Sequence, residues 1–453
     1  MAKNILLILP NQLFDKKHLP KPKDIEQIII YEHPHFFTRF NFNKKKLMLH
    51  RSSMKYYYDY LINKKYNVSY LEYNKDLKIT QTMKDKLLMF DPIDKIKDLE
   101  STISYLEEQS RLIESPNFLL TKKNYQKYRD EKSTKFIFNN FYMWSKELLN
   151  IIPNIKSTDK QNRQSMPNNL NIPKTPSNKS DIKYIDEAAK YVEKHFPKNY
   201  GNTQNFIYPV THTTAKKWLK DFIKHKFEKF GPYEDFVDKN SKNNILFHSC
   251  LSSSINISLV NPEDIIDEIM PLKKTIPINS FEGYIRQLFW REYQRFTYIY
   301  YDFFKDNYFG HKKKLGKEWY NGTTGIKPVD DSIKLGFETG YLHHIIRLMI
   351  IGNWMNMNEI APIEGFKWFM EFSCDSYEWV MCQNVLDMVF FVSGGATMRK
   401  PYSSSSNYIL KMSNYKKDEW CQKWDDTYRK FVLDNKDKLW KFRYHFPLLT
   451  KKK

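Results

Sequence analysis

A strand–helix alternation in the first 121 residues, and its absence afterwards, is the feature that most constrains the fold of this chain. Short β-type runs alternate there with helical stretches, the clearest of which covers residues 52–64. This alternation predicts a parallel, doubly wound sheet with ligands at the carboxyl ends of its strands. No G-x-G-x-x-G motif follows the first run, so a dinucleotide fingerprint is missing. The predicted strands are 5–9, 28–31, 68–73, 87–90 and 118–120.

The chain divides into three parts by pattern. Residues 1–135 form the predicted α/β domain, and residues 136–182 form a linker that begins helical and becomes polar, rich in Asn, Pro, Ser and Lys. Residues 183–453 show helical patterning almost throughout, so we predict an all-helical C-terminal domain. Its clearest helices are 182–195, 214–230, which we expect to be closed by Gly231 and Pro232, and 279–301.

The chain is strongly basic. Its 453 residues include 73 Lys and Arg against 52 Asp and Glu, a net charge of +21 that favours nucleic acid as a partner. Lys and Asn are enriched throughout, so simple solvation also accounts for part of this charge. No run reaches the ~18 apolar residues of a membrane span, and no C-x-x-C pair indicates zinc or a disulfide. We expect a soluble intracellular monomer that makes no membrane contact.

Polar residues embedded in apolar sequence mark a candidate site between residues 338 and 407. The segment 341–354 is apolar enough for a buried helix, yet it contains His343, His344 and Arg347, which must be neutralised or hydrogen-bonded there. Buried titratable groups of this kind indicate a functional site. A structural reading is equally open, in which one histidine belongs to the core and its neighbour, about 100° around the helix, faces solvent.

Short motifs occur along nearly the whole chain. Besides the segment 338–407, they are LPNQL at 9–13, KKKLMLH at 44–50 before SSM at 52–54, NR at 162–163, PVT at 209–211, FGPYED at 230–235, LFHSCLS at 246–252 and YIRQLFWREY at 284–293. Taken in order, they resemble the photolyase and cryptochrome family, and within it the bacterial photolyase-related branch that includes (6-4) photolyases. Each motif is weak alone, but their common order and spacing make a chance match improbable.

The resemblance implies an N-terminal antenna domain and a C-terminal helical domain that holds FAD, in agreement with the two halves described above. Hydroxyls and cations suit the diphosphate of FAD. The helix 279–301 carries several of them, although for this helix taken alone an ordinary surface stripe of ion pairs is the better reading. The residues that the resemblance places at FAD are Ser249, Ser252, Arg286, Trp290 and Arg291, with Asp375, Glu378 and Asn384 around the flavin ring.

Family members repair DNA by electron transfer from light-excited reduced flavin to a damaged pyrimidine pair flipped out of the duplex. The resemblance gives proton transfer at a (6-4) lesion to His344, with His343 beside it and Tyr402 at the lesion pocket. It suggests Trp368, Tyr320 and Tyr377 as an electron-transfer route. The residues at the position of a possible ribolumazine-type antenna are Asn11, where relatives have aspartate, Gln12 and Glu32.

The cysteines depart from the family pattern. Relatives carry an iron–sulfur cluster held by four thiolates, but here only Cys421 is near a ligand position, whereas Cys250, Cys374 and Cys382 lie elsewhere. We therefore predict no iron–sulfur cluster and no other metal. Trp420 and the aromatic residues of 440–444 are expected to fill the vacated space by burial.

The function predicted from sequence is light-driven, FAD-dependent repair of (6-4) photoproducts in damaged double-stranded DNA. Two alternatives stay open. One is a cryptochrome-type blue-light receptor that binds FAD and repairs nothing. The other is a nucleic-acid-binding protein that has lost its photochemistry, which a missing flavin spectrum would reveal.

Overall fold

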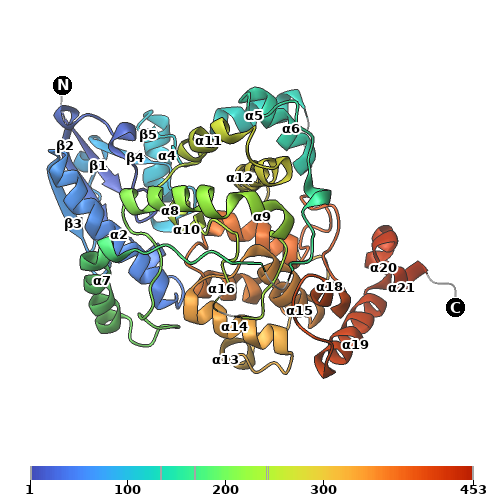
Figure 1. The fold of residues 1–453 in the computed structure, drawn as a ribbon. Helices are drawn as coiled ribbons and strands as arrows, with labels where there is room; N and C mark the ends of the chain where they lie inside the picture. Colours follow the sequence, from blue (N-terminus) through green and yellow to red (C-terminus); the bar gives the residue numbers. More distant parts are fainter. Residues whose placement is uncertain (1–2, 133–134, 168–169, 241, 243, 451–453) are drawn as a thin grey trace.

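A five-stranded sheet lies at one end of the molecule, and helices form the rest. The computed structural model describes residues 3–132, 135–167, 170–240, 242 and 244–450. All strand pairs are parallel, in the order β3-β2-β1-β4-β5, with Leu6 opposite both Ile28 and Leu88. The predicted doubly wound sheet followed by a helical part is confirmed (Figure 1). The strands are β1 (Asn4–Ile8), β2 (Ile25–Tyr31), β3 (Val68–Leu71), β4 (Leu87–Phe90) and β5 (Leu112–Ile113).

The prediction of a strand at 118–120 is wrong, and the fifth strand lies earlier, at β5. In the apolar run 118–120, backbone N–H groups donate to a side chain and not to a neighbouring strand. The amides of Leu119 and Leu120 donate to the two carboxylate oxygens of Glu292, at 2.9 and 3.1 Å. A buried carboxylate thus pins this segment to the helical part and satisfies its N–H groups.

Helices cover the sheet and build the remainder of the chain. In the first half, α2 packs against α7, which matches the predicted helix 182–195. These helices are α1 (Pro34–Phe37), α2 (Lys44–Asn63), α3 (Gln81–Lys84), α4 (Glu100–Glu108), α5 (Lys122–Glu131), α6 (Phe138–Leu148) and α7 (Ile182–His195). The later ones are α8 (His212–His225), α9 (Phe227–Tyr233), α10 (Ser252–Asn256), α11 (Pro262–Ile269), α12 (Ile278–Tyr300), α13 (Glu318–Asn321), α14 (Lys327–Thr339), α15 (Asn353–Met357), α16 (Pro362–Phe372), α17 (Glu378–Met381), α18 (Ser406–Lys411), α19 (Glu419–Asp434), α20 (Lys436–Leu439) and α21 (Pro447–Thr450).

The helix predicted over 214–230 is two helices, α8 and α9, which meet at Lys226. The expected closing residues Gly231 and Pro232 lie inside α9 and do not end it. Gly231 allows α9 to approach the start of α12, because a Cβ atom there would come within 2.7 Å of the Asn279 backbone. Lys226, at this break, is buried, whereas Lys224 and His225 just before it are exposed.

Two helical segments are π-helices with i→i+5 hydrogen bonding, a form that is rare and concentrated at functional sites. They are η8 (Ile346–Gly352) and η9 (Cys382–Val389), which contact one another in the helical core. Gly352 permits the contact, since a Cβ atom on it would lie 2.5 Å from a methyl group of Val389. None of the helices in the described ranges combines the length and apolarity that a bilayer span requires.

Candidate functional site

An ion pair between Arg347 and Asp375 lies at the centre of the helical part. The guanidinium of Arg347, in η8, donates to both oxygens of Asp375 at 2.9 and 3.2 Å. Ser252, at the start of α10, donates to the same carboxylate at 2.6 Å, and Ser373 donates to it as well. Burial opposes the ionisation of Asp375, but Arg347 and these hydroxyls outweigh it and hold its pKa below the usual value.

His343 stacks on His248, which comes from the turn before α10. The ring centroids lie 4.8 Å apart at an angle of 20°. His343 is 4% exposed, and neither of its ring nitrogens has a hydrogen-bond partner among the described residues. Burial, and then the neighbouring His248, His344 and Arg347, lower the pKa of His343 well below 6.5. A buried imidazole with two unused polar atoms is costly unless a ligand supplies their partners.

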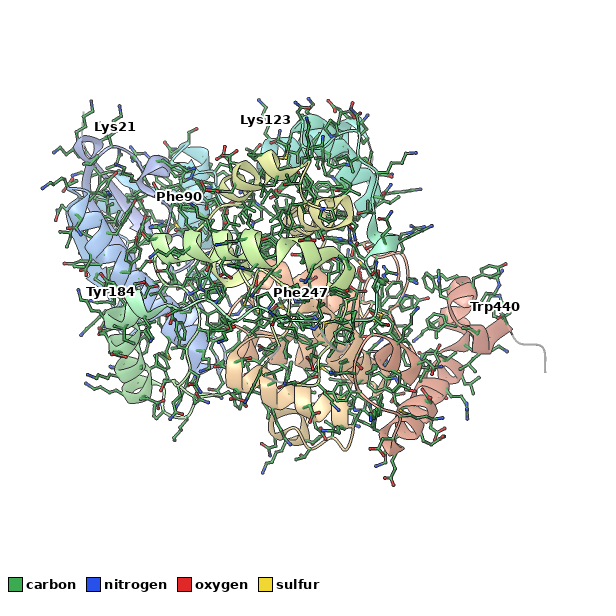
Figure 2. All side chains as sticks on the ribbon, viewed as in Figure 1. Lys21, Phe90, Lys123, Tyr184, Phe247 and Trp440 are labelled. Atoms are coloured by element: carbon green, nitrogen blue, oxygen red, sulfur yellow. The ribbon has the colours of Figure 1, made fainter. Side chains whose placement is uncertain are left out.

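His344 is open to solvent, in contrast to His343. The surrounding protein nevertheless lowers its pKa to about 4, mainly by desolvation and secondly through the charge of Arg347. A side chain can be exposed and yet largely enclosed by protein when it lines a recess, and we read His344 in this way. His248, Ser249 and Ser252 are partly exposed, and Ser252 bonds the buried Asp375, so we read these three residues as lining the same recess. Phe247, beside His248, lies near the middle of the helical part in Figure 2.

Two cations near this recess, the buried Lys226 and the half-buried Arg291, make no ion pair within the described residues. Lys226 is 3% exposed, makes no ion pair or side-chain hydrogen bond within the described residues, and has its pKa lowered by burial. Its charge acts on His248 and Cys250, so it lies close to the turn before α10. Arg291 bonds Asn256 and the backbone of Asn117, but its Nη2 atom is buried without a partner. Both cations suit an anionic ligand, because an unpaired buried charge is strongly unfavourable.

Tyr402, which the sequence predicts at the lesion pocket, lies near Asp235. It is half-buried, lies under the Lys400 ammonium at 5.9 Å, and has its pKa raised chiefly by burial. Burial also raises the pKa of Asp235 to about 6 and that of Glu234 to about 8. The Nε2 atom of His248 lies 3.0 Å from the backbone carbonyl oxygen of Glu234. The stacked residues His248 and His343 are therefore adjacent to the segment that carries Glu234 and Asp235.

The chain is similar in sequence to proteins of a known family. Residues 6–208 match the family model for deoxyribodipyrimidine photo-lyase-related proteins. A (6-4) photolyase of Agrobacterium fabrum is 37% identical over 262 residues, 57% of this chain and 51% of the relative, so the chain spans about half of that relative's length. The chain belongs to the photolyase and cryptochrome family.

Solved structures of the family share the fold. A class III photolyase from Agrobacterium tumefaciens superposes with a TM-score of 0.59 at 15% identity, over 96% of this chain and 88% of that one. A cryptochrome of Synechocystis sp. PCC6803 superposes with a TM-score of 0.63 at 13% identity, over 96% and 89%. The likeness therefore covers both halves of this photolyase-family chain.

The remaining residues predicted at FAD have protein partners. Arg286 pairs with Asp159 at 2.8 Å and Glu234 at 3.2 Å, and Trp290 stacks on Phe138 with centroids 3.6 Å apart. Their roles at the cofactor stay predictions. The other partners are Tyr298 and Arg39 for Glu378, Gln294 for Asn384 and the Leu251 amide for Ser249.

The predicted electron-transfer residues fall into two groups. Trp368 and Tyr320 are connected through Phe337, whose ring lies 5.5 Å from Trp368 and 5.9 Å from Tyr320. Trp368 also contacts Phe372 at 4.7 Å, and Arg347 lies over that ring. Tyr377 instead faces the α/β part, with its ring 6.1 Å from that of Phe36. The structure thus brings two of the three into one aromatic row.

The predicted antenna residues are largely satisfied by the protein itself. Glu32 is fully buried and accepts from Arg51, Tyr70, Tyr191 and the Tyr73 amide, which use the four lone-pair directions of a carboxylate. Gln12 bonds backbone groups of Leu9 and Phe90. Asn11 donates to the Pro92 carbonyl and keeps one buried oxygen without a partner. These residues do not fit a further polar ligand at Glu32 or Gln12.

The expectation that the C-terminal aromatic residues fill a core is right only in part. Trp420 is buried, in edge contact with Trp424, which stacks on Trp354 at 5.1 Å. Trp440 and Tyr444 are exposed, so burial does not explain them.

The four cysteines are all buried and free, and no group of His, Cys, Asp or Glu among the described residues has a geometry suited to a metal.

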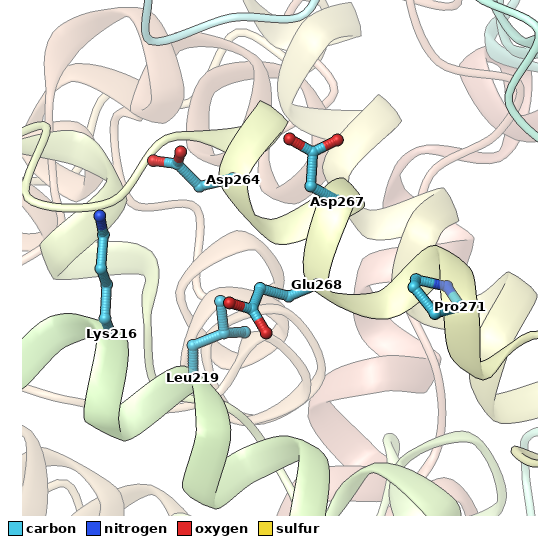
Figure 3. A pocket seen from close by; sticks show the side chains of 6 residues that line it. All are labelled: Lys216, Leu219, Asp264, Asp267, Glu268 and Pro271. Carbon is cyan, nitrogen blue, oxygen red and sulfur yellow. The ribbon is translucent and has the colours of Figure 1, made fainter. Parts of the chain in front are cut away.

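A separate surface pocket of about 320 Å³ lies between α8 and α11 and contains none of the predicted site residues (Figure 3). Its charged lining is mostly acidic, which disfavours a phosphate or nucleic acid. Asp264 on its wall already pairs with Lys17 at 2.7 Å. The lining residues are Lys216, Leu219, Asp264, Asp267, Glu268 and Pro271.

Sequence reasoning missed two residues near the recess, His248 and Lys226, and the pairing of a third, Arg347. His248 lay within a motif, but its partner His343 is distant in sequence. Lys226 resembled an ordinary basic residue at a helix end, and its burial follows from the break between α8 and α9. Arg347 was noted as a buried charge, and its pairing with Asp375 could not be read from spacing.

Proposed function

We propose that this protein is a light-driven, FAD-dependent DNA repair enzyme that acts on (6-4) pyrimidine photoproducts. The observation that carries the proposal is the pairing of buried His343, with both ring nitrogens unused, and solvent-open His344 at one recess. A flipped lesion offers the hydrogen-bonding groups that His343 lacks. The Agrobacterium fabrum relative is a (6-4) photolyase, which supports the same lesion class.

The residues present fit FAD. Lys226 and Arg291 would hold its two phosphates, since Lys226 is buried, the Nη2 atom of Arg291 has no hydrogen-bond partner, and neither makes an ion pair within the described residues. The Arg347–Asp375 pair and Asn384 would meet the polar edge of the flavin ring, with Ser252 orienting Asp375. When bound and reduced, FAD supplies the electron that light releases to the lesion.

His344 would move a proton at one of its ring nitrogens. Its low pKa keeps the free imidazole neutral at pH 7, ready to accept a proton or donate the one it carries. Nearby DNA phosphates would raise this pKa toward neutrality, because negative charge favours the imidazolium. Tyr402 would line the lesion pocket.

DNA binding would be mainly electrostatic. The net charge of +21 supplies phosphate contacts, and lesion preference would come from the smaller cost of flipping an already distorted pair. Affinity should then fall steeply with salt and should be higher for damaged than for intact duplex.

A repair assay tests the proposal. The purified protein, reconstituted with FAD and reduced, is illuminated with blue light in the presence of a duplex that contains one (6-4) photoproduct. We expect restored pyrimidines in the light and none in the dark, with a cyclobutane-dimer duplex as the specificity control. A flavin spectrum without repair of either lesion would favour a photoreceptor, and failure to bind flavin would favour the loss of photochemistry.

A further inference from the structure

The C-terminal segment η10 (Trp440–His445) turns aromatic rings and a cation outward. Trp440 is 49% exposed and Tyr444 is 81% exposed. The Arg443 guanidinium lies 5.2 Å from the first ring and 4.7 Å from the second, and it donates to the Tyr444 hydroxyl at 3.3 Å. We call Trp440, Arg443 and Tyr444 the C-terminal clip. Its rings are held together by one cation before any ligand arrives.

The exposure of the clip does not come from a loose chain end. Leu439 and Phe446, on either side of η10, are fully buried. Phe442 packs edge-on against Phe391 with centroids 5.2 Å apart, and the Lys441 ammonium donates to the Gly394 carbonyl at 2.8 Å. Figure 2 shows Trp440 on the part of the molecule that projects beyond the helical body. A well-anchored segment therefore presents rings that contribute little to packing.

The clip adjoins the loop that leads to Tyr402. Lys441 bonds residue 394 of that loop, and the Lys400 ammonium lies 3.4 Å from the His445 ring. Lys400 also lies over the Tyr402 ring, so two contacts connect the clip to the predicted lesion pocket. Within the described residues, Arg399, Lys400, Lys441 and Arg443 make no ion pair. Their charges are therefore available to an anionic partner.

We propose that the C-terminal clip, together with Lys400 and Lys441, is a DNA-binding surface that stacks on bases unstacked beside the flipped lesion and holds the adjoining phosphates. This inference rests on the proposed repair function. Exposed aromatic rings beside cations match single-stranded or unstacked DNA, since every base offers a π-face and every nucleotide a phosphate. An apolar protein or lipid partner would require a broad apolar patch without these unpaired cations.

Binding of lesion duplex by the full-length protein tests the surface. A 2-aminopurine next to a (6-4) photoproduct reports stacking through its fluorescence, and titration gives the affinity. The paired changes Trp440→Ala and Tyr444→Ala should weaken binding at least about fivefold, the effect of one lost base stack, and should abolish the 2-aminopurine quenching. Phe304→Ala, which removes another aromatic ring that is 49% exposed, should change neither readout.

The phosphate contacts have their own variants. Lys400→Ala with Lys441→Ala should lower the slope of log affinity against log salt by about 2, whereas the exposed pair Lys416→Ala and Lys417→Ala should leave it unchanged. Unaltered affinity, quenching and salt slope in both sets of clip variants would overturn the inference while repair stands. If the unchanged protein does not bind lesion duplex, the proposed function fails and this inference fails with it.

Discussion

The imidazole rings of His248 and His343 stack with centroids 4.8 Å apart, although 95 positions separate the two residues in the chain. His248 is fixed, with its two ring nitrogens 2.9 and 3.0 Å from the carbonyl oxygens of Ile245 and Glu234. The stack therefore holds His343 in place through its ring face and leaves both of its nitrogens unused. Of the two adjacent histidines, His343 is positioned by packing, whereas His344 is open to whatever enters the recess.

His344→Ala should abolish (6-4) repair and leave FAD bound. The side chain is proposed to move a proton and not to hold the cofactor, and loss of a general acid or base costs about 10²- to 10⁴-fold in rate. Repair under blue light and the flavin absorbance of the same sample check both halves. His225→Ala, an exposed histidine at the end of α8, is the control and should repair normally. Undiminished repair by the His344 variant would remove this residue from the mechanism.

Lys226→Met should weaken FAD binding while leaving riboflavin binding unchanged. The buried ammonium is proposed to face the diphosphate, which riboflavin lacks, and a charge-assisted hydrogen bond contributes about 1.5–3 kcal/mol, or roughly 10- to 150-fold in affinity. Flavin fluorescence titrations of the apoprotein measure both ligands. Lys224→Met, an exposed neighbour on α8, is the matched control. Equal weakening of FAD and riboflavin would show that Lys226 acts on the fold and not on the phosphates.

Acid should destabilise the protein partly through His50. Burial and then the charge of Lys46 lower the pKa of this fully buried histidine to about 3. The unfolded chain takes up a proton at His50 below pH 6.5 and the folded chain does not, so stability is lost as pH falls from 6.5 toward 3. Between pH 7 and 5 this group alone costs about 2 kcal/mol. Urea unfolding should show His50→Gln losing less stability over that interval than the unchanged protein, while His225→Gln follows the unchanged protein.

Anaerobically purified protein should contain no stoichiometric iron or acid-labile sulfide. Four thiolates are needed for a cluster, and the cysteines here occupy separate elements: Cys250 in the turn before α10, Cys374 and Cys382 on the two sides of α17, and Cys421 in α19. Metal analysis and sulfide assay decide the matter. About four iron and four sulfide per chain would contradict the prediction.

Elements with strong local patterns could be predicted, whereas positions set by distant partners could not. The strand at 87–90 and the helix at 182–195 have the predicted bounds, because their apolar period and flanking residues are local. The run 118–120 has the composition of a strand, but Glu292 from a distant helix takes its amides. Lys226 illustrates the same limit at the site, since nothing in its neighbours shows that a helix break buries it. Chemical type was visible in the sequence, whereas the pairing of residues that lie far apart in the chain was not.

The two adjoining π-helices affect how residue roles may be transferred between relatives. In a relative with an ordinary α-helix at the place of η8 or η9, the helix covers the same length of the fold with one residue fewer. Each residue of offset in an alignment then rotates the matched side chain by about 100° around the helix axis. Arg347 and Asn384 lie in these segments, which approach closely at Gly352 and Val389. An alignment that runs through them without a gap would therefore pair a residue facing the recess with one facing the core. Superposed coordinates, and not matched letters, should decide which residues of other family members correspond to these two.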